Sequence, residues 1–544
     1  MILPKRKHFV TPRILLADAY TAGSDKFQSE KAKEKSTYYV VFRKKLFSIN
    51  PSLYTQGDDR IIFAGLSRIL EKLFYDPITH AEIDEAKRFL ASARATTTGL
   101  KSYYFPEHLW RRIVDEFNGR PPIEILAMPE GSVVYPNEPV IQITSLVDGF
   151  GELAAWFESK LLHVWAASER VTQDQHFFKY MLEMIYEVEP DLDKETAYFY
   201  ASLMVADFGD RAGIVAEESA ELGMWHLMTW AGTDTFTGAY QAWKNSNETP
   251  LGSSVYALAH RNVQAYEFEG DCYDAMYNLA DNGDIMSMVS DCYAFKPAIK
   301  NHILRLALRS KAEGTGKVVV GRPDSGDALE QVIWMCELAV EHGLYTERVI
   351  NGKTWKFATF LKFIEADGMD FKTMKTIIRA LLDKGFAPYS WGLFGCGGGL
   401  RNGLKRDNLS AKYALCAMGN DNQSVVKFSE VFGKTTLPGP FKVLRDEDSL
   451  RNKKTIVFQD EEGINAMIEF FYGTRLDKPF GVGQDEDFLV WKQRTKDQFS
   501  TMPLSLETEE NHNYPASDSI LERRLELLKK YAPSRDTTNY TVAA

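Results

Sequence analysis

The middle of the chain predicts a parallel α/β barrel, and three features of the sequence support that fold class. One pattern recurs: a short apolar run ends abruptly in polar or glycine residues, and a helical stretch follows. Seven such run ends succeed one another at intervals of 26 to 43 residues, which suits one strand-plus-helix unit. The runs are apolar throughout, as expected for parallel strands covered on both faces. The seven run ends are Asp207, Asp234, His260, Asp291, Asp324, Asp367 and Gly397.

The predicted strands are, in chain order, "AYFYASLMV", "WHLMTWAG", "SSVYALA", "DIMSMV", "GKVVVG", "LKFIE" and "YSWGLF". The longest interval contains Asn351-Gly352 between strand-forming residues, which predicts an inserted β-hairpin. Seven consecutive units favour a closed barrel over an open sheet. Because the carboxyl ends of the strands form the active site of such a barrel, the polar run ends are candidate functional residues.

The flanking segments predict a second domain that is α+β and rich in strands. Residues 1–150 mix helical stretches such as "HAEIDEAKRFLASARA" with strand-like stretches such as "SVVYPNEPVIQITSL". Residues 150–190 have the pattern of two long helices. Beyond Gly399, "AKYALCAM" and "QSVVKFS" have the composition of strands.

These patterns together divide the chain into three expected parts. A discontinuous β-rich α+β domain is expected to contain residues 1–165 and 405–500 and to pack on an α/β barrel of residues 166–404. A C-terminal tail of residues 505–544 is expected to contain one helix, in "SDSILERRLELLKKYAP".

The composition argues against several classes of protein. Lys and Arg total 64 and Asp and Glu total 75, so the net charge is −11, and no dense basic run indicates a nucleic-acid partner. No apolar run approaches the ~20 residues of a membrane span, and the first residues lack the pattern of a signal peptide. The five cysteines show no C-x-x-C spacing, which argues against a disulfide framework or a zinc site. We therefore expect a protein of the reducing cytoplasm, with no nucleic-acid or membrane partner.

Residues 206–213, "ADFGDRAG", contain the Asp-Phe-Gly of protein kinases. A kinase also needs a glycine-rich loop, a lysine-bearing strand and an H-R-D motif before this point, and the sequence has none of them. The aromatic Phe208 followed by Arg211 instead suggests a platform for a flat ring, although a buried phenylalanine is more often part of a core.

Two carboxylates, Asp291 and Asp324, follow separate predicted strands and would converge in a barrel. Such a pair suits sugar hydroxyls, a metal ion or proton transfer. Each aspartate alone could simply cap the following helix. The nearby Arg322, in "GRPDSGD", favours contact with a ligand.

The stretch "GCGGGLRNG" combines free backbone N–H groups with the start of a helix, an arrangement that binds phosphate. The alternative is a flexible turn, and the stretch is not a P-loop because no G-K-[ST] follows. A lone histidine such as His260 is more often structural than catalytic. A third set of residues could be ordinary surface charges unless the substrate is rich in phosphate: Arg43, Arg406, Lys412 and Lys427. The residues thus describe a site for a phosphorylated sugar and a flat ring.

The motifs "LLADAYTAGSDKF", "ADFGDRAG", "GTDT", "SSVYALAH", "VSD", "RPDSG", "ADGMD" and "FGCGGGL", with "KRD" after them, resemble in this order the nicotinamide phosphoribosyltransferases. The resemblance extends from about residue 13 to about residue 430 and is weak over the last hundred residues. It implies a type II phosphoribosyltransferase, a homodimer with an α/β barrel and a β-rich domain. Such an enzyme joins nicotinamide to 5-phosphoribosyl 1-pyrophosphate with Mg²⁺, and releases nicotinamide mononucleotide and pyrophosphate in NAD salvage.

The resemblance also implies roles for individual residues around the nicotinamide ring. Phe208 would stack on one face of the ring, and Tyr20 of the other subunit would cover the opposite face. Asp234 would accept the amide N–H. Arg211 would line the pocket, with Ser287 nearby.

For the phosphoribosyl group, the resemblance implies that Asp291 and Asp324 bind ribose hydroxyls and that Arg322 lines the ring and phosphate pocket. His260 resembles a family histidine that ATP phosphorylates to improve coupling. The expected phosphate and pyrophosphate residues are Arg43, Asp367, Gly368, Gly397, Gly398, Arg406, Lys412 and Lys427.

Three residues depart from the family pattern, and they bear on the width of the ring tunnel. Asp210 stands where an aromatic residue is usual, Ala206 where a histidine is usual, and Ala366 where a glycine is usual. A nicotinate phosphoribosyltransferase of the same architecture, or a homologue that binds metabolites without catalysis, remains an alternative.

Overall fold

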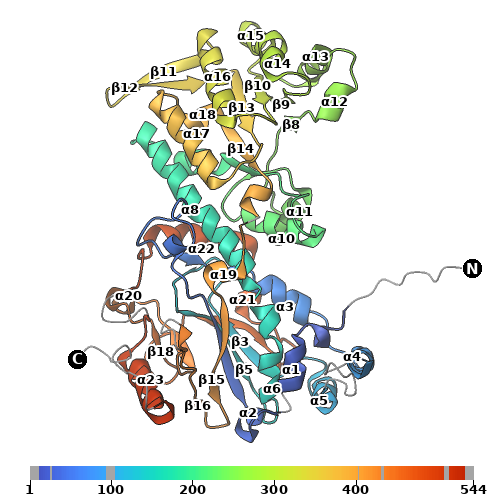
Figure 1. The fold of residues 1–544 in the computed structure, drawn as a ribbon, viewed down its shortest axis with the longest axis vertical. Coiled ribbons are helices and arrows are strands. Elements are labelled where there is room, and N and C mark those ends of the chain that lie inside the picture. The colour runs from blue at the N-terminus through green and yellow to red at the C-terminus, as the bar shows by residue number, and fades with distance from the viewer. Residues whose placement is uncertain are drawn as a thin grey trace, which may run out of the picture. The chain divides into compact units, whose positions relative to one another are not determined.

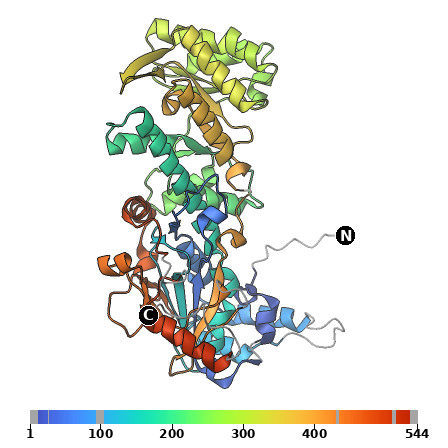
Figure 2. The same cartoon turned by 60° about the vertical axis from the view of Figure 1, so that its left-hand side comes forward.

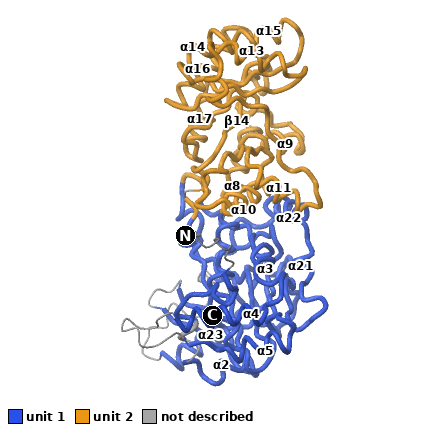
Figure 3. The backbone as a smooth tube through the Cα atoms, turned by 90° about the vertical axis from the view of Figure 1, so that its right-hand side faces the viewer, with its two compact units in different colours: residues 1–51, 56–169, 405–544 blue, residues 52–55, 170–404 orange. Residues whose placement is uncertain are grey.

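The computed structural model describes residues 11–24, 27–92, 104–401, 403–429, 434–507 and 514–532 of the 544-residue chain. The chain forms two compact units (Figure 3). Unit 1 comprises residues 1–51, 56–169 and 405–544, and unit 2 comprises residues 52–55 and 170–404. The helix expected in the C-terminal tail is present as α23 (Asp518–Tyr531) and belongs to unit 1. The three-part division expected from the sequence stays a prediction.

Unit 2 is built on a seven-stranded parallel sheet surrounded by helices (Figures 1 and 2). The strand order is β7-β6-β14-β13-β10-β9-β8. One parallel bridge between Gly232 and Ser253 joins the two ends of this order. The predicted parallel α/β fold class is therefore confirmed for unit 2. The strands are β6 (Val205–Asp207), β7 (Gly232–Thr233), β8 (Tyr256–Ala257), β9 (Ile285–Val289), β10 (Val318–Arg322), β13 (Leu361–Glu365) and β14 (Gly392–Cys396).

The helices of unit 2 alternate with these strands along the chain. They are α9 (Lys194–Leu203), α10 (Ala216–His226), α11 (Phe236–Lys244), α12 (His260–Gln264), α13 (Glu269–Leu279), α14 (Phe295–Ala298), a π-helical turn (Ile299–Ile303), α15 (Leu304–Glu313), α16 (Ala328–Glu341), α17 (Phe371–Asp383), α18 (Pro388–Trp391) and the 3₁₀ turn η5 (Gly398–Leu400). Helix α8 (Val164–Val188) begins in unit 1 and has most of its length in unit 2.

The hairpin predicted at Asn351-Gly352 is confirmed. Strands β11 (Tyr345–Ile350) and β12 (Lys353–Ala358) pair in antiparallel register around these two residues. Asn351 has φ of 50° and Gly352 has φ of 76°, as a tight two-residue turn requires.

Two of the predicted strands are mostly helical. The run "AYFYASLMV" forms the end of α9 and leaves only three residues for β6. Asp193 caps α9 by accepting the N–H of Thr196, and Ala197 and Ala201 are buried at the four-residue spacing of a helix. "WHLMTWAG" likewise forms the end of α10 and a turn before the two-residue β7.

Unit 1 contains a six-stranded antiparallel sheet in the order β16-β15-β1-β5-β3-β19, so the predicted β-rich α+β class is confirmed. Two small sheets, β17–β18 and β2–β4, accompany it. Ile520 and Leu521 of α23 join the core formed by Tyr39 of β1 and Phe441 of β17. The strands are β1 (Ser36–Val41), β2 (Ile61–Ile62), β3 (Ile123–Ala127), β4 (Val133–Val134), β5 (Pro139–Ser145), β15 (Lys412–Met418), β16 (Gln423–Ser424), β17 (Phe441–Val443), β18 (Ile456–Phe458) and β19 (Ile468–Tyr472).

The two long helices predicted for residues 150–190 are not what the structure shows, because two short helices precede the single long α8. The helices of unit 1 are α1 (Ala19–Ser24), α2 (Glu30–Glu34), α3 (Leu66–Phe74), α4 (His80–Ser92), α5 (Glu107–Phe117), α6 (Gly151–Trp156), α7 (Glu158–Leu161), α19 (Arg406–Leu409), α20 (Glu447–Asn452), α21 (Val482–Asp485), α22 (Phe488–Thr501) and α23, with 3₁₀ turns at Arg13–Leu15 and Leu46–Ser48. Within the described ranges, no helix is both long enough and apolar enough to cross a membrane.

Candidate active site

The histidine and the two carboxylates singled out in the sequence lie together in unit 2. Nε2 of His260, the first residue of α12, is 3.2 Å from Oδ1 of Asp291. Its Nδ1 is 3.8 Å from Oδ2 of Asp324. The hydroxyl of Ser325 donates to Oδ2 of Asp291 at 2.5 Å. The loops after β9 and β10 thus bring two carboxylates to opposite sides of one imidazole, an arrangement that suits polar ligand groups and proton or phosphoryl exchange.

Arg322 faces the interior of the barrel. A side chain at the preceding Gly321 would meet Ile299 and Met335 of the surrounding helices, so the alternation along β10 turns its neighbours inward. A guanidinium nitrogen of Arg322 donates to the carbonyl oxygen of Leu258 at 3.2 Å. Its Nε is buried and has no hydrogen-bond partner among the described residues. This donor is available to a ligand.

Ser287 is a second interior group with an unused hydroxyl. It pairs with Val320 in the parallel register of β9 and β10, and Val320 lies on the interior face of β10 next to Gly321. Its Oγ is buried and has no partner in the described part of the chain. Buried polar groups are normally hydrogen-bonded, so Ser287 and Arg322 mark a polar spot inside the barrel that suits a ligand.

Phe208 lies directly against the backbone of β14. A Cβ atom at Gly395 would be 2.3 Å from the phenyl ring, so only glycine leaves room for the ring here. The N–H of Phe208 donates to the carbonyl oxygen of Cys396 at 2.9 Å. The ring is therefore packed against a strand and only partly buried, as a stacking platform requires.

Asp234 and Arg211, the other residues predicted near the ring, are exposed. Asp234 donates its backbone N–H to the carbonyl oxygen of Asp207 at 2.8 Å. This bond ties Asp234 to the start of the platform loop, the segment 208–215 between β6 and α10 that contains Phe208. Its carboxylate accepts a hydrogen bond from the hydroxyl of Ser254. Ser254 was not singled out in the sequence, although it lies in the motif "SSVYALAH". Of the departures from the family pattern, Asp210 accepts a hydrogen bond from Thr237 at 2.9 Å.

The predicted phosphate residues of unit 2 lie on two loops that touch. The glycine loop contains Gly397, Gly398 and Gly399. A Cβ atom at Gly399 would be 2.0 Å from the carbonyl oxygen of Met369, so the backbone of this loop packs on the backbone of the loop after β13. Asp367 and Gly368 in that loop are exposed, and Gly368 has φ of 61°. Gly397 and Gly398 are half-buried at the start of η5.

A buried ion pair joins the glycine loop to the platform loop. Nη2 of Arg401 is 2.9 Å and 3.0 Å from the two carboxylate oxygens of Asp207. The side chains of Arg401 and Asp207 are 4% and 1% exposed, and Asp207 also accepts the N–H of Gly209 at 3.1 Å. Burial acts to raise the pKa of the Asp207 carboxyl, but His226, Arg401 and Arg170 together hold that pKa below its ordinary value. The carboxylate is therefore an anion at neutral pH, and its ion pair links the two loops.

The predicted cations Arg43, Arg406, Lys412 and Lys427 belong to unit 1, as does Tyr20. Burial lowers the pKa of Lys412, the carboxylate of Glu158 opposes that effect, and Lys427, Arg43 and Arg406 reinforce it. The other three cations are thus close enough to Lys412 to act on its charge, which suits a polyanion. The hydroxyl of Tyr20 is 3.4 Å from Glu158, a residue that the sequence did not single out.

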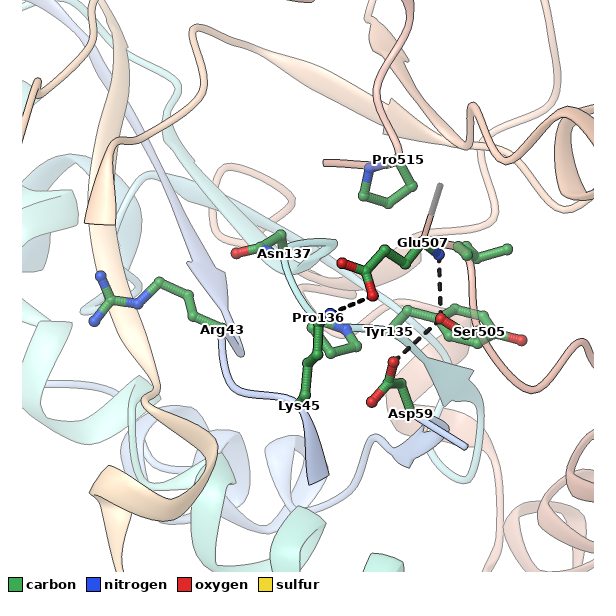
Figure 4. Close-up of a pocket in the computed structure, with 10 residues that line it drawn as sticks. Arg43, Lys45, Asp59, Tyr135, Pro136, Asn137, Ser505, Glu507 and Pro515 are labelled. Carbon is green, nitrogen blue, oxygen red and sulfur yellow. Dashed lines mark hydrogen bonds and ion pairs between the residues drawn. The ribbon is translucent and has the colours of Figure 1, made fainter. Parts of the chain in front are cut away.

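Arg43 also borders a cavity of about 290 Å³ in unit 1, but the close-up shows its guanidinium pointing away from the acidic lining residues (Figure 4). It donates instead to the carbonyl and hydroxyl oxygens of Ser410, at 3.2 Å and 3.0 Å. Lys45 in the cavity is paired with Glu507, and Asp59 accepts from Ser505. The cavity therefore offers no unpaired lysine to a phosphate.

Sequence comparisons relate this chain to known proteins. The model of the nicotinate phosphoribosyltransferase (NAPRTase) family matches residues 203–436, and the model of the nicotinamide phosphoribosyltransferase N-terminal domain matches residues 13–125. A nicotinamide phosphoribosyltransferase of Xanthomonas campestris is 28% identical over 81% of this chain and 89% of its own length. The chain belongs to the nicotinamide phosphoribosyltransferase family. A second relative with the same name, from Acinetobacter baylyi, is 24% identical over 64% of this chain and 72% of its own length.

Solved structures show that the fold is shared more widely than the family. Human nicotinic acid phosphoribosyltransferase superposes with a TM-score of 0.53 at 13% identity, covering 94% of this chain and 100% of its own. Nicotinate-nucleotide pyrophosphorylase from Pyrococcus furiosus has the same TM-score and identity, covering 91% and 98%. At such identities the likeness concerns the architecture of the nicotinamide phosphoribosyltransferase family, not its choice of substrate.

Proposed function

We propose that the chain condenses nicotinamide with 5-phosphoribosyl 1-pyrophosphate to give nicotinamide mononucleotide and pyrophosphate. Both relatives described above are named nicotinamide phosphoribosyltransferase, which supports this proposal. The observation that carries this proposal is the group His260–Asp291–Asp324 at the carboxyl ends of neighbouring barrel strands. In the same unit lie an aromatic platform and a glycine loop, so that ring, ribose and phosphate each have a matching subsite.

Catalysis by this site consists of alignment and charge neutralisation. The bond from C1 of the ribose to pyrophosphate breaks with oxocarbenium character, and the pyridine nitrogen attacks C1 from the opposite face. That nitrogen carries no proton, so no general base is required. Asp291 and Asp324 would hold the ribose hydroxyls, and Phe208 would orient the ring for attack. The pyrophosphate leaves with its electron pair, which cations and Mg²⁺ stabilise.

Mg²⁺ is proposed to arrive with the pyrophosphate group of the substrate. Among the described residues, no group of three or more His, Cys, Asp or Glu side chains is arranged to hold a metal ion. Mg²⁺ is commonly bound through substrate phosphates with one or two carboxylates, so the absence of a protein cage fits this cation.

ATP is proposed as a coupling substrate that phosphorylates His260. Both imidazole nitrogens face carboxylates, and the side chain is 41% exposed, so a nucleotide can reach it. The transfer chemistry described above makes no use of this histidine, which is consistent with a separate coupling role.

Assay of nicotinamide mononucleotide formation from the two substrates and Mg²⁺ tests the activity directly. The wild type should form product, and Asp324→Ala should lose most of the activity because it removes a ribose contact. A folded wild type that forms no product with either nicotinamide or nicotinate would support the alternative of a non-catalytic homologue.

Asp234 is expected to decide between nicotinamide and nicotinate. A carboxylate can accept the amide N–H, a charge-assisted bond worth about 1.5–3 kcal/mol, whereas a nicotinate carboxylate would be repelled by several kcal/mol. We expect Asp234→Asn to narrow the preference in kcat/KM sharply, mainly through faster turnover of nicotinate. Asp210→Asn is a matched control because Asp210 is also exposed and lies on the adjacent loop. An unchanged ratio in Asp234→Asn would place the selectivity at other residues.

We also propose a homodimer in which Tyr20 enters the site of the other subunit. Four apolar side chains are exposed beside the platform loop, at the beginning of α10 and on α11, and a second copy would cover them: Ile214 (92%), Val215 (54%), Phe236 (90%) and Tyr240 (58%). Tyr20 is itself 62% exposed.

Mixing two inactive variants tests the shared site. Tyr20→Ala and Asp324→Ala are each expected to be nearly inactive, and subunit exchange should restore part of the activity because one of the two mixed sites is then intact. Exchange is verified independently with differently tagged subunits. Absence of recovery after complete exchange would place Tyr20 in the site of its own subunit.

A cytoplasmic location is proposed from the cysteines. All five lie within the described residues and all five are unpaired thiols, as is usual in a reducing compartment.

A further inference from the structure

Glu365 is a buried carboxyl group directly beneath the proposed phosphate loop. It is the last residue of β13 and is 1% exposed. Its Oε1 accepts the backbone N–H of Asp367 at 3.0 Å, so it supports the loop that exposes Asp367 and Gly368. Its Oε2 is buried without a hydrogen-bond partner among the described residues. Neither the sequence motifs nor the mechanism above assigns this group a role.

Within the described residues, Glu365 forms no ion pair with a Lys, Arg or His side chain. Lys362 lies on the same strand three residues earlier, and the alternation of side chains along β13 places it on the opposite face. The charges that act on it from neighbouring loops are those of Asp367 and Asp324, and both are negative. Arg322, at the end of the adjacent β10, is instead engaged with the carbonyl oxygen of Leu258.

The other elements around β13 add no charge. Strand β14 places Phe394 opposite Glu365 in the register. The buried faces of α16, α17 and α18 carry apolar side chains and one thiol, that of Cys336.

An ionised carboxylate without a counter-charge is unfavourable in such a place, and a carboxyl group avoids the penalty by keeping its proton. Burial, reinforced by Asp367 and Asp324, raises the pKa of Glu365 to about 7, although the backbone N–H groups of Asp367 and Ala366 oppose the effect. The protonated oxygen is uncharged, so leaving it buried without a partner costs less than leaving a carboxylate oxygen in the same place.

We propose that Glu365 is a positioning residue that holds a proton beneath the phosphate loop, and that binding of the substrate's phosphate group is linked to retention of this proton. The inference rests on the proposed function, because it takes the loop of Asp367 and Gly368 as the site of the 5′-phosphate. Glu365 itself need not touch the substrate. It supports the loop through Oε1 in both states, and only its neutral state leaves the loop without an added negative charge.

The linkage has a definite sign. A phosphate group that is doubly ionised above pH ~7 brings further negative charge to the loop and favours the protonated form of Glu365. Binding then takes up a proton whenever free Glu365 is ionised. Affinity should be constant at pH values where Glu365 is neutral in the free enzyme, and it should fall by up to about tenfold per pH unit above that range.

The experiment is a calorimetric titration of the full-length enzyme with 5-phosphoribosyl 1-pyrophosphate and Mg²⁺ between pH 6.5 and pH 9. Wild type should show a Kd that rises severalfold per pH unit above pH 7. Glu365→Gln keeps the acceptor for the Asp367 N–H but cannot ionise, so its Kd should change much less over the same range. Glu341→Gln, an exposed change of the same type on α16, is the matched control and should behave as wild type. Nicotinamide, which has no phosphate, should bind all three proteins with the same pH dependence.

Proton uptake measured on the wild type alone gives an independent readout if Glu365→Gln folds poorly. Titrations at pH 8 in buffers of different ionisation enthalpy should show net uptake of a substantial fraction of one proton. Equal pH dependence in wild type and Glu365→Gln, or no uptake in the wild type, would overturn the inference while leaving the enzyme assay positive. A wild type that neither binds the phosphoribosyl substrate nor forms product would overturn the proposed function itself, and the inference with it.

Discussion

Strands β6 and β13 end in the same hydrogen-bonded arrangement, but the pKa values of their terminal carboxyl groups are shifted in opposite directions. In each, the carboxylate of the last strand residue accepts the N–H of the residue two positions on: Asp207 from Gly209 at 3.1 Å, and Glu365 from Asp367 at 3.0 Å. Both carboxylates are 1% exposed. At β6 the second partner is Arg401, and the pKa of Asp207 lies below its ordinary value. At the end of β13, Glu365 has no ion-pair partner among the described residues, and its pKa is raised to about 7.

The difference shows that a local backbone motif does not decide the protonation state of its carboxyl group. The Asp207–Arg401 pair is a permanent anchor that ties the platform loop to the glycine loop. Glu365 provides the same backbone contact with a group that can gain or lose a proton near neutrality. One strand end is suited to hold the ring platform at all pH values of interest, and the other can respond to the charge of a bound phosphate.

Replacing Arg401, the cation paired with Asp207, should give the largest change in the free energy of unfolding. Arg401→Met removes the cation that is directly paired with the buried carboxylate of Asp207, and breaking a buried ion pair typically costs about 3–5 kcal/mol. We expect a loss of this size in the free energy of unfolding at pH 8, measured by urea and thermal denaturation. The loss should be smaller at pH 5, because the pKa of Asp207 rises without Arg401 and a proton can then replace the cation. A variant as stable as the wild type at both pH values would show that the pair is not an anchor.

Glu365→Gln should give the next largest change in the free energy of unfolding, and this change should be a gain at alkaline pH. The pKa of Glu365 in the folded protein is about 7, above its ordinary value of 4.5, so its contribution to stability is complete below that ordinary value and is lost as the pH rises through 7. The side chain of the variant cannot ionise, so its free energy of unfolding should not fall in this way. The difference in free energy of unfolding between Glu365→Gln and the wild type should therefore grow by about 2–3 kcal/mol in favour of the variant between pH 4.5 and pH 8.5. Denaturation over this pH range checks the prediction, with Glu341→Gln as control. A constant difference between wild type and Glu365→Gln would mean that Glu365 is already ionised near its ordinary pKa.

Replacing both members of the Asp207–Arg401 pair should give the smallest change in the free energy of unfolding. Asp207→Asn with Arg401→Met removes both charges, and the amide oxygen can still accept the N–H of Gly209. We expect the double variant to recover about 1–2 kcal/mol of the stability lost in Arg401→Met at pH 8, and to show little dependence on pH. Asp207→Asn alone completes the thermodynamic cycle. Additive losses in the double variant would indicate that the two side chains stabilise the loops independently of one another.

The strand ends were largely predictable, but the strands that carry them were less so. Asp291, Asp324 and the glycines of "GCGGG" were located from short apolar runs that stop abruptly, and the structure places all of them at the carboxyl side of barrel strands. Two of the runs were misassigned, because aromatic and apolar residues such as those of "AYFYASL" suit a buried helix as well as a strand. The Asp193 cap was the local signal that decides for the helix.

The order of the motifs along the chain determined the family, the parallel α/β class and the candidate residues for ring, ribose and phosphate. These properties depend on residue type and spacing, which one sequence contains in full. The tertiary structure alone decided that Arg401, almost two hundred residues beyond Asp207, pairs with that carboxylate, and that Glu365 has no such partner among the described residues. Both residues end apolar runs and look alike in the sequence. Their charges differ because burial and the nearest counter-charge are set by which loops the barrel brings together, and these long-range neighbours are not encoded in either local motif.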